Sequence, residues 1–218
     1  MSTAARRRLT LLAVPVAAAV CLAGCGGSGD AGSPNPAGST SSERDSGSNA
    51  AFQSARVIVI QIAVDTKLVT ADAIGPGVVN NGVVANTGQL NTWYESGNTN
   101  LYLASGGPVT LGDEVAKAEA AVHHLRHFQT AEDRSKKTAA WTAEQVARVI
   151  LVQDLVDAKD IPSASVQGMT DASGAIVAGP ALDTWFTAHQ GDQLPGGSST
   201  LASEVALIAG PGGALNAA

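Results

Sequence analysis

The chain has little cysteine and lacks the common hydrolase motifs. Its two cysteines, Cys21 and Cys25, both lie close to the N-terminus. The rest of the chain therefore cannot form a disulfide, a cysteine-ligated zinc site or a thiol nucleophile. Neither GxSxG nor HExxH occurs, and the stretches GGSG and GPGG do not follow a strand as a dinucleotide site requires. We expect a domain that is held together by its apolar core, with no enzymatic activity and no cofactor.

The apolar stretch near the N-terminus is too short to span a bilayer comfortably. It runs from Leu9 to Leu22, follows three arginines at 6–8 and ends in LAGC at Leu22–Cys25, whereas a membrane helix needs about 20 residues. A basic flank, an apolar core and small residues are typical of an export signal. An ordinary secretory signal with a chance cysteine, or a single membrane span, is the alternative. The route of export, general or twin-arginine, stays open.

The LAGC motif resembles the lipobox of bacterial prolipoproteins. The resemblance implies that the signal, residues 1–24, is cut before Cys25, which receives a diacylglycerol and usually an acyl chain such as palmitate on its new amino group. Two or three chains hold a protein on a membrane far longer than one does. We therefore expect a protein anchored through Cys25 on the extracytoplasmic side of the cell membrane.

Basic side chains are also scarce. Three of the 13 Lys and Arg lie in the signal, so the mature chain has ten basic and 19 acidic side chains, a net charge of −9. Such a surface is a poor partner for nucleic acid and is repelled by anionic head groups, which leaves lipid as the anchor. Residues 26–50 are rich in Gly, Ser, Pro and Asn, and with Cys25 they predict a disordered tether over 25–50.

Residues 51–218 contain an internal duplication. ARVIVIQIAVDTK (55–67) is repeated as ARVILVQDLVDAK (147–159), 92 positions later, and GVVANTGQLNTWY (82–94) lies on GAIVAGPALDTWF (174–186) in the same register. With two residues fewer, TLGDEVA (110–116) lies on TLASEVA (200–206). We therefore expect one mainly α-helical globular domain made of two packed repeats, about 51–142 and 143–218, whose size makes each marginal alone.

The repeat also assigns the secondary structure. VIVIQIAV alone suggests a buried strand, but its partner follows a capping-box pattern at Thr142 and Gln145 and stops before Pro162. We therefore predict helices over 52–68 and 143–160, with further helices over 113–133 and 201–209. Residues 78–84 and 169–177 suggest hairpins, with plain loop as the alternative. We expect Trp93 and Trp185 to fill equivalent core pockets, in preference to an aromatic ligand site.

Histidines supply the clearest candidate ligands. His123 and His127 are four residues apart on one predicted helix face, a spacing that lets two imidazoles reach one metal ion, and His189 could be a third ligand. Because Arg126 adjoins the pair and the second repeat has no matching histidines, we prefer a solvated helix face without metal. The repeated Asp65 and Asp157 suggest helix-end ion pairs or capping, not acid–base chemistry.

The segment from Asp113 to Val166, which ends in ILVQDLVDAKDIPSASV, is similar to the helical peptide-binding region of SurA-type extracytoplasmic chaperones. That resemblance implies a cradle for unfolded or extended peptide, without catalysis, although no isomerase domain follows. We therefore expect a non-catalytic domain that binds another envelope protein or a peptide. A small-molecule or metal-binding lipoprotein that serves a transporter or sensor is the alternative.

Overall fold

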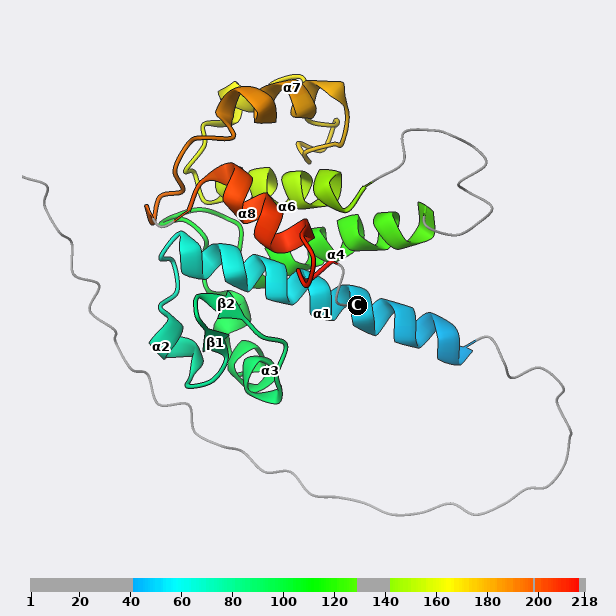
Figure 1. Ribbon diagram of the computed structural model, residues 1–218, viewed down its shortest axis with the longest axis vertical. Coiled ribbons are helices and arrows are strands. Elements are labelled where there is room, and N and C mark those ends of the chain that lie inside the picture. Colours follow the sequence, from blue (N-terminus) through cyan, green and yellow to red (C-terminus); the bar gives the residue numbers. More distant parts are fainter. Residues whose placement is uncertain (1–40, 129–141, 198, 216–218) are drawn as a thin grey trace, which may run out of the picture. The chain divides into compact units, whose positions relative to one another are not determined.

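The computed structural model of the chain describes residues 41–128, 142–197 and 199–215 (Figure 1). This part of the protein is mainly helical, as the sequence predicts. Its elements in chain order are α1 (Ser41–Asp65), α2 (Ala71–Ile74), β1 (Val79–Asn80), β2 (Val83–Val84), α3 (Gly88–Glu95), the 3₁₀ helix η1 (Asn98–Asn100), α4 (Leu111–Phe128), α6 (Ala143–Asp157), the 3₁₀ helix η2 (Ser163–Val166), α7 (Pro180–His189) and α8 (Leu201–Ala209).

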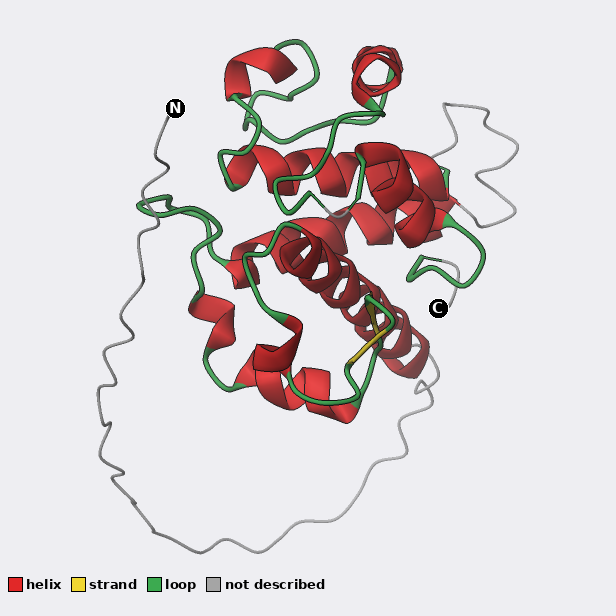
Figure 2. Ribbon diagram, turned by 60° about the vertical axis from the view of Figure 1, so that its left-hand side comes forward, coloured by secondary structure: helices red, strands yellow, loops and turns green. Residues whose placement is uncertain are grey.

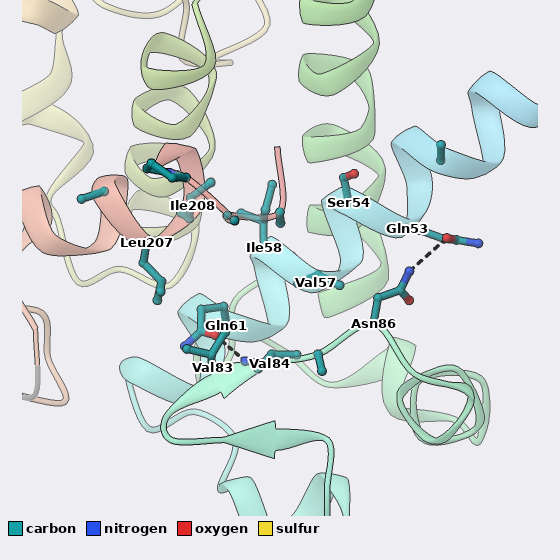
Figure 3. Close-up of a pocket in the computed structure, with 18 residues that line it drawn as sticks. Gln53, Ser54, Val57, Ile58, Gln61, Val83, Val84, Asn86, Leu207 and Ile208 are labelled. Carbon is teal, nitrogen blue, oxygen red and sulfur yellow. Dashed lines mark hydrogen bonds between the residues drawn. The ribbon is translucent and has the colours of Figure 1, made fainter. Parts of the chain in front are cut away.

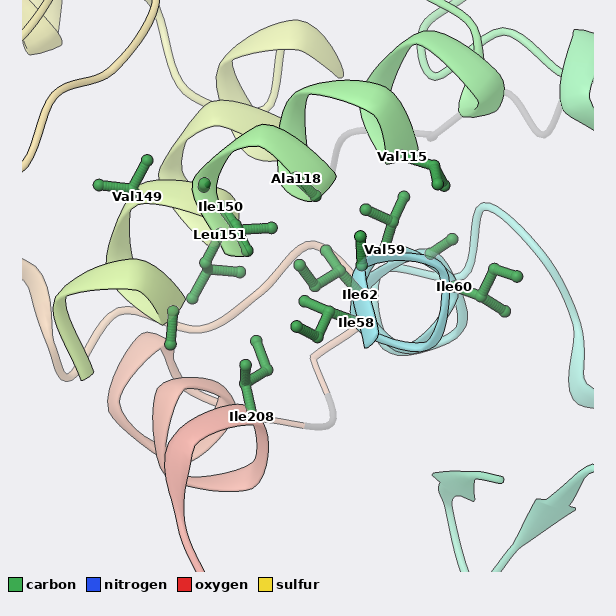
Figure 4. Packing of buried hydrophobic residues seen from close by; sticks show 14 of the residues in the cluster. Ile58, Val59, Ile60, Ile62, Val115, Ala118, Val149, Ile150, Leu151 and Ile208 are labelled. Atoms are coloured by element: carbon green, nitrogen blue, oxygen red, sulfur yellow. The ribbon is translucent and has the colours of Figure 1, made fainter. Parts of the chain in front are cut away.

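Four helices form the core. α1 packs on α4, α6 packs on α8, and the two pairs meet where α6 contacts both α1 and α4. Figure 4 shows Ile58 and Ile62 of α1 directed towards α6 and α8, while Ile60 points away from them. All three side chains are fully buried. A helical stretch that is apolar around its circumference is stable only when neighbours cover it, and residues 58–63 of α1, all of them buried, form such a stretch.

The smaller elements lie on opposite sides of these core helices. α2, the β-hairpin and α3 lie against the α1 side, and α7 lies beyond α6 (Figure 1 and Figure 2). α3 and α7 are equivalent in the repeat and begin at Gly88 and Pro180, 92 positions apart. Each contributes its Leu and its last large aromatic side chain to the core.

The duplication predicted from the sequence is visible in the backbone. α1 and α6 end at Asp65 and Asp157, and the second residue after each end, Lys67 or Lys159, has a positive φ of 62° or 63°. α4 and α8 begin 90 residues apart, which matches the two-residue deletion. The two halves therefore share helix ends and turns as well as sequence.

Helix starts follow their capping signals. The Thr142 Oγ1 accepts from the Gln145 amide at 3.1 Å, and the Gln145 Oε1 accepts from the Thr142 amide at 3.2 Å. This reciprocal capping box begins α6 at the predicted residue. Thr200 caps α8 in the same way, and α8 covers the predicted range 201–209.

The first hairpin is confirmed, and the second is reduced to a bridge. Val79 pairs with Val84 in β1 and β2, and the turn residues Asn81 and Gly82 have φ of 51° and 83°. These positive φ values are those of a tight hairpin turn. At the equivalent place in the second half, Thr170 and Ile176 form an isolated antiparallel bridge instead of a hairpin.

The boundary of the first helix differs from the prediction. α1 begins at Ser41 instead of residue 52, so the last ten residues of the predicted tether belong to a helix. The remainder of the tether and the signal, residues 1–40, lie outside the described residues, as do 129–133 at the end of the predicted third helix. α1 and α6 also end a few residues before the predicted 68 and 160, where the positive-φ lysines stop them.

The two tryptophans occupy equivalent helical positions and pack against the core, as predicted, but they lie at its edge and do not fill pockets within it. Both are only partly buried. Leu90 and Tyr94 of α3, and Leu182 and Phe186 of α7, are the buried residues. Trp185 instead stacks on His189, with ring centroids 4.5 Å apart. The faces of these short helices are rotated so that the residue after each tryptophan points inwards.

Candidate functional site

One candidate site is a groove beside α1, which we call the larger groove because it exceeds a second groove described below. It has a volume of about 610 Å³ and lies between α1, the β-hairpin, α8 and residues 210–214 (Figure 3). Such a volume lies in the usual range of ligand pockets. Aliphatic side chains from three elements form its walls, namely Val57, Ile58, Val83, Val84, Leu207 and Ile208.

A short polar network lies at one end of the larger groove. The Asn86 Nδ2 donates to the Gln53 Oε1 at 3.0 Å, and the Arg56 Nη2 donates to the Asn86 Oδ1 at 2.9 Å. Arg56 also lies over the Phe52 ring, 5.6 Å from its centroid. The groove thus combines aliphatic walls with amide groups that can donate and accept hydrogen bonds.

The duplication builds a second, smaller groove of about 330 Å³ between α6, α4 and residues 171–177. Val149, Ile150 and Gln153 line it at positions equivalent to Val57, Ile58 and Gln61. α4 takes the place that α8 has in the larger groove, so each groove combines elements of both halves. The lining has nevertheless changed, because Lys117 stands at the position equivalent to Leu207, and the acidic Glu114 and Asp171 also line this groove.

One glutamine in each half ties its helix to the turn that walls its groove. The Gln61 Oε1 accepts from the Val84 amide at 2.7 Å, and the Gln61 Nε2 donates to the Asp65 Oδ2 at 2.7 Å. In the second half the Gln153 Oε1 accepts from the Ile176 amide at 2.8 Å, and its Nε2 donates to the Asp157 Oδ2 at 2.8 Å. The repeated aspartates therefore orient these glutamines, a role that the sequence analysis did not anticipate.

Each of these aspartates also meets a buried glutamate from the other half. Glu114 of α4 hydrogen-bonds to Asp157 of α6, and Glu204 of α8 hydrogen-bonds to Asp65 of α1. Both glutamates have no exposed surface. The predicted helix-end ion pair is present at Asp157, whose Oδ2 lies 2.5 Å from the Lys117 Nζ. The contacts of the two aspartates with buried glutamates were not predicted, because the sequence does not show which side chains meet at the boundary between halves.

Burial keeps protons on this cluster. It raises the pKa of Glu114 to about 9, and the nearby Asp154 adds to the shift. The pKa of Glu204 rises to about 8 through burial and the neighbouring Asp65, and burial with Asp157 nearby raises the pKa of Asp154 to about 8. These three carboxyl groups are neutral at pH 7, because a charged carboxylate is poorly solvated in an apolar interior.

Asp157 has the opposite shift. Burial acts to raise its pKa, but hydrogen bonds from Lys117, Glu114 and Gln153 outweigh it and lower the pKa. The Lys117 Nζ lies 2.5 Å from the Asp157 Oδ2 and 3.3 Å from the Glu114 Oε2. The shared proton of this pair therefore stays on Glu114, and Asp157 is the anion that Lys117 neutralises.

The histidines predicted as low-priority ligands are only partly placed. His123 is exposed on α4, with its Nε2 3.6 Å from the Glu119 Oε1. His189 ends α7, where its Nδ1 lies 2.9 Å from the Asp192 Oδ2. The side chain of His127 and the lipidation candidate Cys25 lie outside the described part. Within the described ranges no group of three His, Cys, Asp or Glu side chains is arranged to hold a metal ion.

Comparisons with known proteins leave the chain without an assigned relative. No protein-family model matches it, and neither the curated proteins nor the solved structures include a significant match. Among residues 41–128, 142–197 and 199–215, no helix is both long and apolar enough to cross a membrane. The grooves and the buried carboxyl pairs are therefore the observations that bear on function.

Proposed function

We propose that the protein is a lipoprotein anchored through Cys25 on the extracytoplasmic side of the cell membrane, and that its helical domain binds an extended apolar segment of another protein without catalysis. The observation that carries the binding proposal is the larger groove, about 610 Å³ of open space with aliphatic walls from α1, β2 and α8. Lipid on Cys25 would keep this groove near the membrane surface.

The lining of the groove favours a peptide. Its small aliphatic side chains suit Val, Leu or Ala side chains, whose burial contributes about 25 cal/mol per Å². The Gln53–Asn86 amide pair at one end can exchange its internal hydrogen bond for bonds to a peptide backbone. An acidic mature chain further favours segments without acidic residues.

A direct test measures the binding of fluorescently labelled ten-residue peptides, apolar and uncharged, to the purified chain by anisotropy. Val83 on β2 is 45 % exposed and Leu68 is 40 % exposed, but only Val83 lines the groove. We expect Val83→Asp to weaken binding at least tenfold and Leu68→Asp to leave it unchanged. Equal loss in both variants, or no binding by the wild type, would contradict the peptide proposal.

A small apolar molecule is the second candidate occupant, because the groove volume lies within the 300–1,000 Å³ typical of small-molecule sites. Native mass spectrometry of the chain purified from its host membrane separates the two. A discrete bound mass below about 1 kDa that Val83→Asp removes would favour the small molecule. Peptide binding to the same groove would then not be the main function of the domain.

The anchor is tested separately. We expect Cys25→Ala to leave an uncleaved precursor, or to move the protein from the membrane to the medium, because no lipid can then be attached. Detergent-phase partitioning of wild type and variant measures this. A processed Cys25→Ala protein that still partitions with detergent would rule out lipidation at this residue.

A further inference from the structure

The two halves are joined by carboxyl pairs that require a proton. Glu204 of α8 belongs to the second half and hydrogen-bonds to Asp65 of α1 in the first. Two carboxyl groups can form a hydrogen bond only when one of them is protonated, because two carboxylates are both acceptors. Glu204 has no exposed surface, so bulk water cannot replace that bond while the helices stay packed.

This pair is connected to both walls of the larger groove. Asp65 accepts a hydrogen bond from Gln61, and Gln61 holds the hairpin wall through the Val84 amide at 2.7 Å and the Gly82 carbonyl at 2.8 Å. The opposite wall, formed by Leu207 and its neighbours, begins within the same helix turn as Glu204. One proton therefore sits where α8, α1 and the hairpin are connected.

The equivalent pair, Glu114 and Asp157, also joins the two halves but has a cation beside it. Lys117 lies next to Glu114 and Asp157 and can neutralise the charge that remains if Glu114 loses its proton. At the position of Lys117 the second half has Leu207, which supplies no charge. Ionisation of Glu204 is therefore the more disruptive event, because no lysine stands at the position equivalent to Lys117 to offset the new charge.

The charged groups around the pair agree with that asymmetry. Asp154 of α6, which is buried near the Glu114–Asp157 pair, raises the pKa of Glu204 because a negative charge on Asp154 would repel a negative charge on Glu204. The Ser199 Oγ donates to the Glu204 Oε2 at 3.3 Å, a neutral contact. The remaining charged neighbours, Asp157, Asp160 and Lys117, act on Asp154.

We propose that the proton shared by Glu204 and Asp65 is a clasp on the larger groove, and that rising pH opens the groove by releasing α8 and the hairpin from α1. The inference stands on the connection of Glu204, Asp65 and Gln61 and not on any ligand of the groove. It therefore holds or fails independently of the peptide proposal.

The direction of the effect follows from linkage. In the closed state the pKa of Glu204 is raised to about 8, whereas in an open state it returns towards the ordinary value of a glutamate. The open state then loses a proton that the closed state keeps. The open population therefore rises about tenfold per pH unit between roughly pH 5 and 8, and it becomes independent of pH above about pH 8. Acid closes the groove.

Hydrogen exchange measured by mass spectrometry on the full chain in detergent tests the clasp. After correction for the intrinsic pH dependence of exchange, we expect opening of α8 (201–209) and of the hairpin (79–84) to increase about tenfold per pH unit from 5.5 to 7.5. Residues 58–62 of α1 report global unfolding and should exchange more slowly. In Glu204→Gln, whose amide can still donate to Asp65, the increase should vanish.

The controls separate the clasp from general effects. Glu95→Gln changes an exposed carboxyl on α3, and opening of α8 in this variant should depend on pH as in the wild type. The same is expected for Glu114→Gln in the other pair. The clasp does not exist if the opening of α8 and of residues 58–62 has the same dependence on pH. It also does not exist if opening in Glu204→Gln depends on pH as in the wild type. Should Glu204→Gln fail to fold, the carboxyl ¹³C shift of Glu204 in the wild type decides, since a midpoint near its ordinary pKa overturns the proposal.

Discussion

The stability of the folded domain should fall as pH rises through the neutral range. Burial raises the pKa of Glu114 to about 9 and the pKa values of Asp154 and Glu204 to about 8. In the unfolded chain the same groups ionise near their ordinary values. Between about pH 5 and 8 the folded state therefore holds more protons than the unfolded state, and the free energy of unfolding decreases with pH.

The magnitude can be bounded. Each extra proton held by the folded state lowers the free energy of unfolding by roughly 1.4 kcal/mol per pH unit, and three independent protons would give roughly 4 kcal/mol per pH unit. The three carboxyl groups share one cluster, so the slope should lie between these limits. Even one proton amounts to roughly 3 kcal/mol over two pH units, which is large against a typical domain stability of about 5–15 kcal/mol.

Urea denaturation followed by circular dichroism at pH 5.5, 6.5 and 7.5 measures this slope. We expect the urea midpoint to fall with each step, and Glu114→Gln or Glu204→Gln to flatten the dependence. Glu95→Gln, at an exposed position, should have the wild-type slope. A midpoint that stays constant or rises with pH would refute the reasoning, because it would mean that the buried carboxyl groups are ionised in the folded protein.

Three further predictions concern single residues. Lys159→Gly should raise the free energy of unfolding by about 1 kcal/mol, because a φ of 63° is strained for a residue with a Cβ atom. Lys159→Ala keeps the Cβ atom and should give no such gain, and urea titration compares the two variants. Gln61→Ala should cost about 1–3 kcal/mol in the same assay, since it leaves the buried Val84 amide unpaired, and a smaller loss would mean that water replaces the amide. Phe186→Ala should cost about 3–5 kcal/mol, and Trp185→Ala should cost less because Trp185 is only partly buried. The reverse order in thermal melts would place the tryptophan in the core.

Much of the helical architecture could be predicted from the repeat. VIVIQIAV at 57–64 has the composition of a strand, and only its alignment with a capped helix at 143 indicates otherwise. The structure explains the composition, since residues 58–63 of α1 are all buried and packing outweighs the low helix propensity of Val and Ile. The early start of α1 at Ser41 could not be predicted, because Ser, Gly and Asn, which have low helix propensity, dominate residues 41–50.

The candidate site was harder to predict. The repeated TLGDEVA and TLASEVA already show that Glu114 and Glu204 occupy equivalent positions, and a glutamate repeated on the inner face of an apolar helix is a signal for a buried acid. The signal does not name the partner. Asp65 and Asp157 lie in sequence far from these glutamates. Only the fold, in which α8 packs on α6 and α4 contacts both α1 and α6, brings each pair together.

The crossed pairing also bears on whether either half can exist alone. Glu114 needs Asp157 and Glu204 needs Asp65, so a separated half would expose or leave unpaired one buried glutamate and lose one wall of its groove. Burying a polar group without a partner costs several kcal/mol, and a unit of fewer than 100 residues has little stability to spare. A second copy of the same half could satisfy both needs by donating the missing helix. The duplication is therefore best understood as a symmetric pair joined in one chain, in which Lys117 and Leu207 have made the two grooves chemically different.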